Sequence, residues 1–417
     1  MSEESATVAM RRLFQQAVSA FTQHRYADAQ PLLERAAEGH DAEAQNLLGI
    51  MLLNGMGVTP DVRRAAVLFE AAAAGGLKEA HYNLANIKFN AIGAVRDEAA
   101  AQRHLLAAAR AGHRPSLRSL GFIYHAAGKQ DRWPALATHC FRLAAEAGDP
   151  LAQYIYGLRL NRGHGTPADP LAAADCFAAA AQAGVYLARE RLAEVRELTQ
   201  SRTQLPAARA DEELPPCLLP ELPPAEPART VAFMSEHRDA LDEYLGDHLI
   251  NVAAPRLMPS GVVDPDTGAA VHSELRTSHS MHFQPSMYDA AVYLALRRIA
   301  WIAGSPPEHA EPLGVLRYGP GQEYRPHYDY YTDDRHEVQR VATVFVYLNE
   351  VAEGGGTDFP RLAVKVDPER GKAVKFLNCT PGGEPNPDTL HAGLPVVRGE
   401  KWLATLWFWD RPFRWFG

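Results

Sequence analysis

The sequence predicts a multidomain protein in which an N-terminal all-α solenoid of helical repeats precedes a C-terminal α+β domain. Three observations support this prediction: small residues recur at a fixed interval in the first half, prolines gather near the middle, and 22 of the 36 aromatic residues lie in 228–417. The chain has 417 residues, 47% of them hydrophobic and 22% charged. That length allows about two to three domains of ~100–200 residues, and the composition is that of globular proteins.

The repeat is most visible at one small-residue position, because Gly49, Ala85, Gly121 and Gly157 follow one another at intervals of 36 residues. Ala-rich runs that end in glycine predict a helix, a turn and a second helix in each unit. We expect about four to five units over residues 10–200. The stretches Ala44 to Gly49 and Asn54 to Val58 resemble Sel1-like repeats, relatives of tetratricopeptide repeats. This resemblance implies a surface that binds a protein partner, and a purely structural stack is the alternative.

Residues 201–227 are predicted to link the two halves. Seven prolines between 206 and 227 remove helix hydrogen-bond donors and favour extended conformation. We expect a semi-rigid spacer or a strap along a domain surface, with halves that can fold separately on either side.

The C-terminal domain, residues 228–417, combines expected helices with expected strands. Helices are predicted at 234–250 and 288–303. Alternation and aromatic or β-branched content predict strands at 313–318, 341–348, 373–377 and 402–409. Helices followed by many strands indicate an α+β domain with a sandwich or barrel core.

Four residues of this domain carry the chemistry. His327 and Asp329 are two positions apart, so a strand places both side chains on one face, and His391 follows 62 residues later. Two histidines and one carboxylate can occupy one face of Fe(II) and leave three positions for a bidentate 2-oxo acid and dioxygen. Lys401 is a natural partner for the distal carboxylate of that acid. A second His-x-Asp, at His237 and Asp239, is read as a solvated helix face.

These residues stand in blocks that closely resemble the prolyl 4-hydroxylase-type 2-oxoglutarate/Fe(II)-dependent dioxygenases. The blocks are 274–278, 317–329, 342–349, 354–360, 391–393 and 401–402. The resemblance implies a double-stranded β-helix (jelly-roll) core, iron ligation by His327, Asp329 and His391, and a 2-oxoglutarate C5 carboxylate held by Lys401. It also implies Fe(II), 2-oxoglutarate and O2 as the reacting groups, with ascorbate as an accessory.

The same resemblance implies supporting roles for four further residues. Tyr318 is expected near the metal-binding end of the co-substrate, and Tyr347 and Thr405 near its distal carboxylate. Arg276 is expected at the substrate entrance, with a salt bridge as the alternative. For the tyrosines and Thr405 the alternative is an ordinary core residue with a bonded hydroxyl. Trp407 is predicted to pack rather than to contact substrate.

The predicted function is hydroxylation of a prolyl residue in a peptide or protein, with the repeats recruiting the substrate or a partner. The alternatives are a hydroxylase of a non-prolyl residue or a small molecule, and a non-catalytic helical-repeat adaptor. A net charge of −8 disfavours nucleic acid as a partner. The absence of an apolar run of ~20 residues and of a signal sequence predicts a cytoplasmic protein without a membrane partner.

Overall fold

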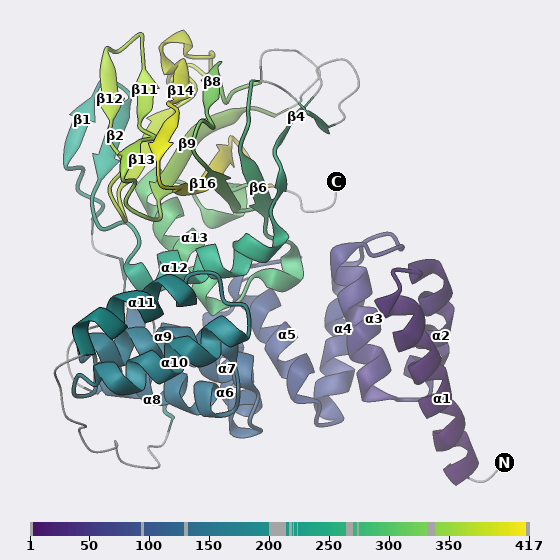
Figure 1. The fold of residues 1–417 in the computed structure, drawn as a ribbon. Coiled ribbons are helices and arrows are strands. Elements are labelled where there is room, and N and C mark those ends of the chain that lie inside the picture. The colour runs from purple at the N-terminus through teal and green to yellow at the C-terminus, as the bar shows by residue number, and fades with distance from the viewer. Residues whose placement is uncertain are drawn as a thin grey trace.

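The computed structural model describes residues 3–92, 96–128, 132–199, 214–216, 219, 221–222, 224–263, 270–272, 275–331 and 338–413. The described part begins with antiparallel pairs of helices stacked into a solenoid, shown in purple to teal in Figure 1. Its helices are α1 (Glu3–Thr22), α2 (Tyr26–Glu38), α3 (Ala42–Asn54), α4 (Val62–Ala74), α5 (Lys78–Phe89), α6 (Glu98–Arg110), α7 (Arg114–Ala126), α8 (Trp133–Glu146), α9 (Pro150–Arg162), α10 (Pro170–Gln182) and α11 (Ala188–Thr199).

The 36-residue period has a steric cause. A methyl group on Gly49 would lie 2.6 Å from the ring of Phe69, and the equivalent glycines 121 and 157 face Phe141 and Phe177 just as closely. In the unit that has Ala85 in place of glycine, the phenylalanine position is taken by the smaller Leu105. The helices of each pair therefore approach through a small residue opposite a large one.

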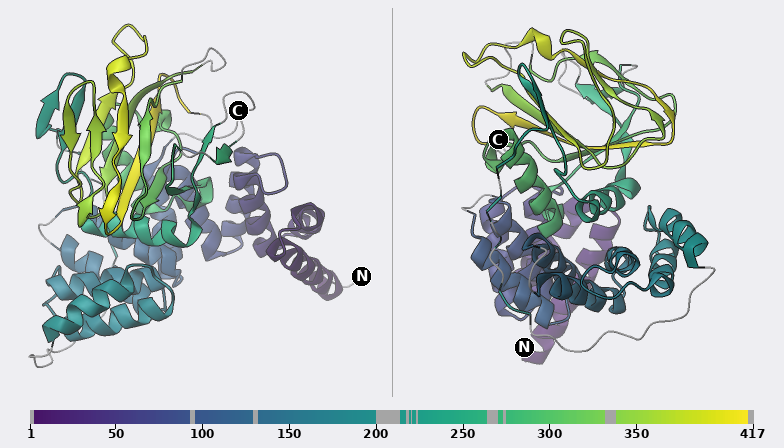
Figure 2. Two further views of the ribbon diagram at one scale, coloured as in Figure 1. Left: turned by 45° about the horizontal axis from the view of Figure 1, so that its top comes forward. Right: turned by 90° about the vertical axis from the view of Figure 1, so that its left-hand side faces the viewer.

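The C-terminal domain is built from two facing antiparallel sheets (Figure 2, right). The larger has the order β1-β2-β13-β9-β16-β7-β6-β3 and the smaller β12-β11-β14-β8, with the two-stranded pairs β10-β15 and β4-β5 beside them. The strands are β1 (Arg229–Val231), β2 (Met234–His237), β3 (Met258–Pro259), β4 (Gly261–Val263), β5 (Ala270–His272), β6 (His279–His282), β7 (Gly314–Tyr318), β8 (Tyr324–His327), β9 (Arg340–Tyr347), β10 (Glu353–Gly354), β11 (Thr357–Phe359), β12 (Val364–Val366), β13 (Ala373–Leu377), β14 (His391–Gly393), β15 (Val396–Arg398) and β16 (Lys401–Trp409). This arrangement is the expected jelly-roll.

Two helices, α12 (Glu243–Ala253) and α13 (Ala290–Ala303), lie between the larger sheet and the solenoid (Figure 1). Single 3-10 turns occur at Ala254–Arg256, Pro285–Met287, Pro307–His309 and Pro387–Thr389. The helix expected at 234–250 is partly wrong, because residues 234–237 form β2. Asp239 has a positive φ of 51°, which no helix accepts, and the Asp242 side chain accepts from the Leu245 backbone N–H at the true helix start. The second His-x-Asp therefore lies at a strand end and not on a helix.

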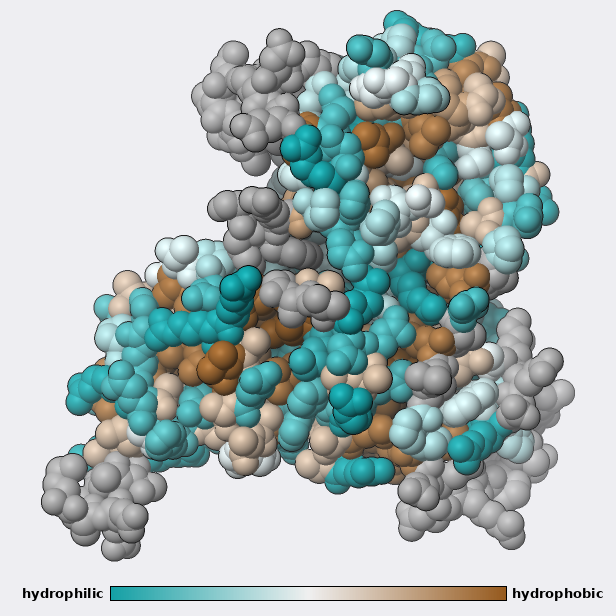
Figure 3. Space-filling view, turned by 180° about the vertical axis from the view of Figure 1, so that it is seen from behind, coloured by the Kyte–Doolittle hydropathy of each residue, from teal (hydrophilic) through white to brown (hydrophobic). Residues whose placement is uncertain are grey.

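Alternation along the central strands divides their side chains between two cores. Leu316, Phe345, Tyr347 and Leu403 point between the sheets, while Val315, Val344, Val346 and Ala404 point outward. The outward residues belong to one continuous hydrophobic cluster that runs through α12 and α13 into the helices from α5 onward. A second cluster fills the N-terminal helices, which project away from the C-terminal domain (Figures 1 and 3).

Buried polar groups also join the two domains. The Tyr154 hydroxyl donates to Asp247 Oδ2 at 2.6 Å, and Arg191 and Arg370 both pair with this carboxylate, which is 0% exposed. His248 Nε2 lies 3.1 Å and Arg118 NH2 3.6 Å from Asp289 Oδ2. Because buried charges need such partners, the interface is specific in its geometry, and the proline-rich boundary does not separate two independently packed units.

Most of residues 201–227 lie outside the described part, and the described pieces follow the domain surface. Leu214, Leu219 and Ala225 pack on the shared cluster, and the Tyr124 hydroxyl donates to the Pro215 carbonyl at 2.6 Å. These contacts are those of a strap. Among the described helices, none combines the length and apolar character that a bilayer crossing requires.

Candidate active site

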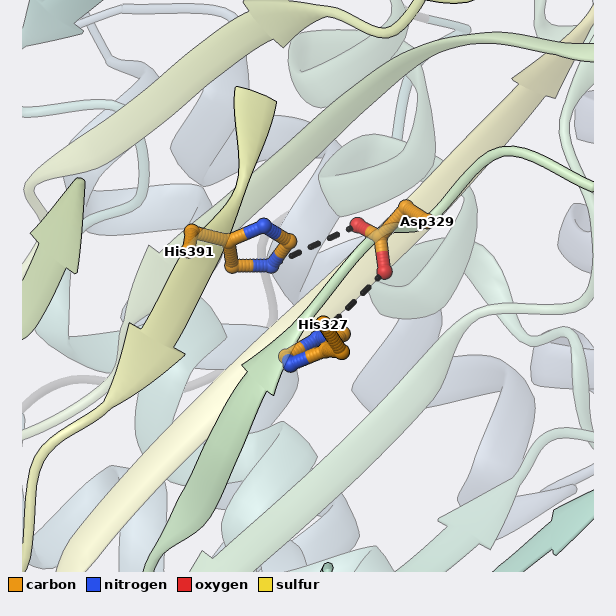
Figure 4. Close-up of side chains that lie close together, drawn as sticks. All are labelled: His327, Asp329 and His391. Carbon is orange, nitrogen blue, oxygen red and sulfur yellow. Dashed lines mark ion pairs between the residues drawn. The ribbon is translucent and has the colours of Figure 1, made fainter. Parts of the chain in front are cut away.

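Three ligand-type side chains converge between the two sheets from neighbouring strands. His327 ends β8 and His391 begins β14, and their Cα atoms are paired across the antiparallel ladder. Asp329 lies two residues beyond the end of β8, and its carboxylate faces both imidazoles from one side (Figure 4). Asp329 Oδ1 is 3.6 Å from His327 Nε2, and Asp329 Oδ2 is 3.8 Å from His391 Nε2. All three ligand atoms lie within 4.8 Å of one another.

Backbone carbonyls orient both histidines for ligation. His327 Nδ1 lies 2.8 Å from the Arg325 carbonyl oxygen, and His391 Nδ1 lies 2.9 Å from the Thr389 carbonyl oxygen. A carbonyl only accepts, so each Nδ1 carries the proton and each Nε2 presents its lone pair to the space beside Asp329. That is the tautomer a metal ligand needs.

The charge states also suit a cation. Burial and the neighbouring His391 lower the pKa of His327 to about 3, so this imidazole is neutral at pH 7. Burial raises the pKa of Asp329, but His391, His327, Arg340 and the Thr343 hydroxyl together outweigh it and hold the pKa below its usual value. The triad therefore offers an ionised carboxylate beside the neutral imidazole of His327.

Lys401 lines the same pocket as the triad. Its side chain is 0% exposed, and Nζ has no hydrogen-bond partner among the described residues. Nζ lies 4.3 Å from the centre of the Tyr318 ring, and a methyl group on Gly393 would lie 3.3 Å from it. The glycine leaves space beside the ammonium, and burial lowers the pKa of Lys401 to about 7. A buried cation without a partner beside free space is a site for an anion.

The volume of the pocket that the centre of a water molecule can reach is about 60 Å³. Of the four supporting residues, Tyr318, Thr405 and Arg276 line it. The Tyr347 hydroxyl instead lies 2.8 Å from Thr357 Oγ1, and Thr357 lines the pocket. Arg276 is 8% exposed, its guanidinium lies 5.0 Å over the Tyr324 ring, and its Nε donates to Ser278 Oγ at 3.2 Å, while no ion pair among the described residues includes it. The roles of these four residues toward co-substrate and substrate stay predictions.

Several pocket residues were not anticipated from the sequence. Thr343 Oγ1 donates to Asp329 Oδ2 at 2.8 Å, and Asn378 Nδ2 donates to Thr343 Oγ1 at 2.9 Å, which fixes the carboxylate. Trp407, expected to pack, also lines the pocket, with Arg340 4.3 Å over its ring. Thr343 was detectable as a polar residue at an inward position of an apolar strand. The other unanticipated lining residues are Leu316, Tyr324, Phe345, Thr357, Gly393 and Leu403.

The residues present fit an iron ion with a bound 2-oxo acid. The open triad suits Fe(II), and the Lys401 ammonium, to which no described residue offers a hydrogen bond, suits the distal carboxylate of 2-oxoglutarate. His327, Asp329 and His391 would hold the metal, and Lys401 would hold the acid.

Comparison with known proteins agrees with this geometry. Residues 313–409 match the family described as the 2OG-Fe(II) oxygenase superfamily, and 42–77, 78–113, 115–149 and 150–185 each match the Sel1 repeat. Prolyl 4-hydroxylase 5 of Arabidopsis thaliana is 37% identical over 190 residues, covering 40% of this chain, and the chain spans 65% of that relative's length. Prolyl 4-hydroxylase 1 of the same plant is 38% identical over 178 residues, with coverages of 39% and 63%.

One similar solved structure is the viral collagen prolyl hydroxylase of Paramecium Bursaria Chlorella virus-1 in its 2OG complex. It is 30% identical, with a TM-score of 0.36, and the match covers 43% of this chain and 97% of that one. Repeats similar to the first half occur in a Sel1 repeat protein from Oxalobacter formigenes, 24% identical with a TM-score of 0.40, covering 44% and 72% of the two chains.

Proposed function

Because this chain belongs, through its C-terminal domain, to the 2OG-Fe(II) oxygenase superfamily, we propose that it hydroxylates prolyl residues of a peptide or protein. The observation that carries the proposal is one pocket that joins an open His-Asp-His triad to the buried Lys401, whose Nζ has no hydrogen-bond partner in the described part of the chain. Relatives named as prolyl 4-hydroxylases support proline as the target. Ascorbate as an accessory and a cytoplasmic location belong to the same proposal.

The chemistry of the bound groups sets the stoichiometry. Fe(II), 2-oxoglutarate and O2 supply an oxidation that converts one substrate C–H bond to C–OH and yields succinate and CO2. The protein's own residues orient and shield: Thr343 and Asn378 fix the Asp329 carboxylate, two backbone carbonyls fix the imidazoles, and Lys401 anchors an acid. The apolar walls formed by Leu316, Phe345 and Leu403 exclude water.

The repeats are proposed to recruit the substrate or a partner protein. Helices α3, α5, α7 and α9 already contact α12, α13 or the turn at Pro285–Met287 of the C-terminal domain. The projecting pairs α1-α2 and α3-α4 leave more of their surface to another protein (Figure 1). Binding there would raise the local concentration of a macromolecular substrate without changing the metal site.

The test uses a peptide with several prolines and a matched peptide with alanine at each of those positions. We expect mass spectrometry to find one added oxygen atom on proline and succinate formed in equal amount, and only uncoupled succinate formation with the alanine peptide. Modification at another residue type would support the non-prolyl alternative. No succinate under any condition would support the adaptor.

A pH effect should accompany co-substrate binding. Burial lowers the pKa of Lys401 from 10.5 to about 7, so at pH 8 the amine is mostly neutral, and a bound dicarboxylate restores its charge. Binding should take up about one proton at pH 8 and almost none at pH 6, and affinity should fall about tenfold per pH unit above 7. Titration calorimetry of the Mn(II)-loaded protein in phosphate and in Tris measures the uptake. Heats at pH 8 that do not depend on the buffer would contradict it.

A further inference from the structure

The two strands that carry Lys401 and Tyr318 line the pocket with one face and contact the solenoid with the other. Lys401 and Tyr318 are Cα partners on β16 and β7 and line the pocket. Their neighbours Trp402 and Arg317 are also partners, and alternation turns Trp402 outward into the cluster shared with the solenoid. A contact on the outer face therefore acts on the residues directly adjacent to the pocket cation.

The solenoid makes such a contact through Tyr186, which follows the last Sel1 repeat. Its hydroxyl donates to Glu400 Oε2 at 2.7 Å, and its ring meets the Trp402 ring edge-on at 5.3 Å. Glu400 also accepts from Trp402 Nε1 at 3.1 Å and pairs with Arg317. The next residue, Leu187, is tied to the C-terminal domain because its N–H donates to Asn251 Oδ1 at 3.0 Å.

The backbone around Lys401 is held at the same place. Asn349 Nδ2 donates to the Glu400 carbonyl at 2.8 Å, and Asn349 Oδ1 accepts from the Trp402 N–H at 2.8 Å. Lys401 Nζ has no partner of its own among the described residues, so the ammonium is placed by its stem and by residues 400 and 402. Tyr186 is the solenoid residue that joins Glu400 and Trp402 at once.

We propose that Tyr186 is a positioning residue for the co-substrate pocket, which makes the C-terminal end of the solenoid, just after the last Sel1 repeat, a structural part of the 2-oxoglutarate site. This inference rests on the proposed function, in which Lys401 binds the distal carboxylate. Tyr186 touches neither metal nor co-substrate. It fixes the Glu400 side chain and the Trp402 ring, and through them the position of the ammonium between those residues.

The test is calorimetric binding of 2-oxoglutarate to the full chain loaded with Mn(II), which needs no turnover. Tyr186→Phe removes one hydroxyl at a residue that is 40% exposed, so the fold should be retained. We expect the Kd for 2-oxoglutarate to rise about 3- to 10-fold, as loss of one charge-assisted bond allows, while the Kd for Mn(II) alone is unchanged.

Tyr293→Phe is the matched control. The Tyr293 hydroxyl of α13 donates to Glu98 of α6, which is also a tyrosine–carboxylate bond between the domains but involves neither β16 nor β7. Its Kd for 2-oxoglutarate should equal that of the wild type. If Tyr293→Phe weakens binding as much as Tyr186→Phe, the effect is general loosening of the interface and the inference is overturned.

Lys401→Ala separates this inference from the proposed function. It should weaken 2-oxoglutarate binding by at least about 30-fold. Unchanged binding in Lys401→Ala would refute the carboxylate assignment itself. Weakened binding in Lys401→Ala together with unchanged binding in Tyr186→Phe would leave the assignment intact and refute the positioning role.

Discussion

Replacing Asp329 with asparagine is expected to reduce succinate formation and Fe(II) affinity by about 100-fold or more. Metal-bound imidazoles are neutral, so the Asp329 carboxylate is the only ligand of the three that balances the charge of a dication, and the amide removes that negative charge. It keeps the side-chain shape and an oxygen that can accept from Thr343, so the fold should persist. Succinate formation at saturating 2-oxoglutarate and the absorption of bound Co(II) together measure the loss.

The chain contains its own control for this substitution. Asp239 belongs to the other His-x-Asp sequence, is exposed, and has a positive φ that asparagine tolerates. Asp239→Asn should retain both metal affinity and turnover. Wild-type Co(II) binding in Asp329→Asn would show that the metal lies elsewhere.

A fragment that begins at Ala228 is expected to be recovered mainly as insoluble protein. Truncation uncovers the apolar faces of α12 and α13, and it leaves Asp247 without Tyr154 and Arg191 and Asp289 without Arg118. Breaking one buried ion pair costs about 3–5 kcal/mol, a large share of the ~5–15 kcal/mol that stabilises a typical domain. Soluble yield and near-ultraviolet circular dichroism measure the outcome.

Removal of residues 1–40 is the control for that truncation. Helices α1 and α2 pack within the N-terminal cluster, and no described residue of the two helices bonds to the C-terminal domain. This shorter deletion should keep 2-oxoglutarate turnover. A soluble 228–417 fragment with wild-type 2-oxoglutarate turnover would show that the shared cluster is not needed for folding, and the repeats would then be a tethered module.

Features that have a long pattern in the sequence were predicted best. The four main strands were predicted within a residue or two, because alternation over five to nine residues is a strong pattern. The triad and Lys401 could be named because a two-residue spacing and an ordered set of blocks carry them.

Other features depend on pairings that no local pattern encodes. Asn378, Thr343 and Asp329 are joined by hydrogen bonds because Phe376 pairs with Thr343 across β13 and β9. The whole sheet sets that register. The expected helix at 234–250 extended across a turn whose break depends on backbone conformation at Asp239. The interface between the domains has one signal in the sequence. Asp247, His248 and Asn251 interrupt the apolar face of α12, and polar residues at such positions indicate buried partners.

The shared cluster also restricts how this protein can change in evolution. Solenoids usually gain or lose whole units by duplication and deletion, because each unit contacts only its neighbours. Here a unit inserted or deleted between α5 and α11 would shift Tyr154, Tyr186 and Arg191 out of register with a rigid jelly-roll. Copy number is therefore free to vary only at the N-terminal end, before α3, whose Asn54 accepts from the Ser286 N–H. Homologues of different length should differ there, with the C-terminal units held constant.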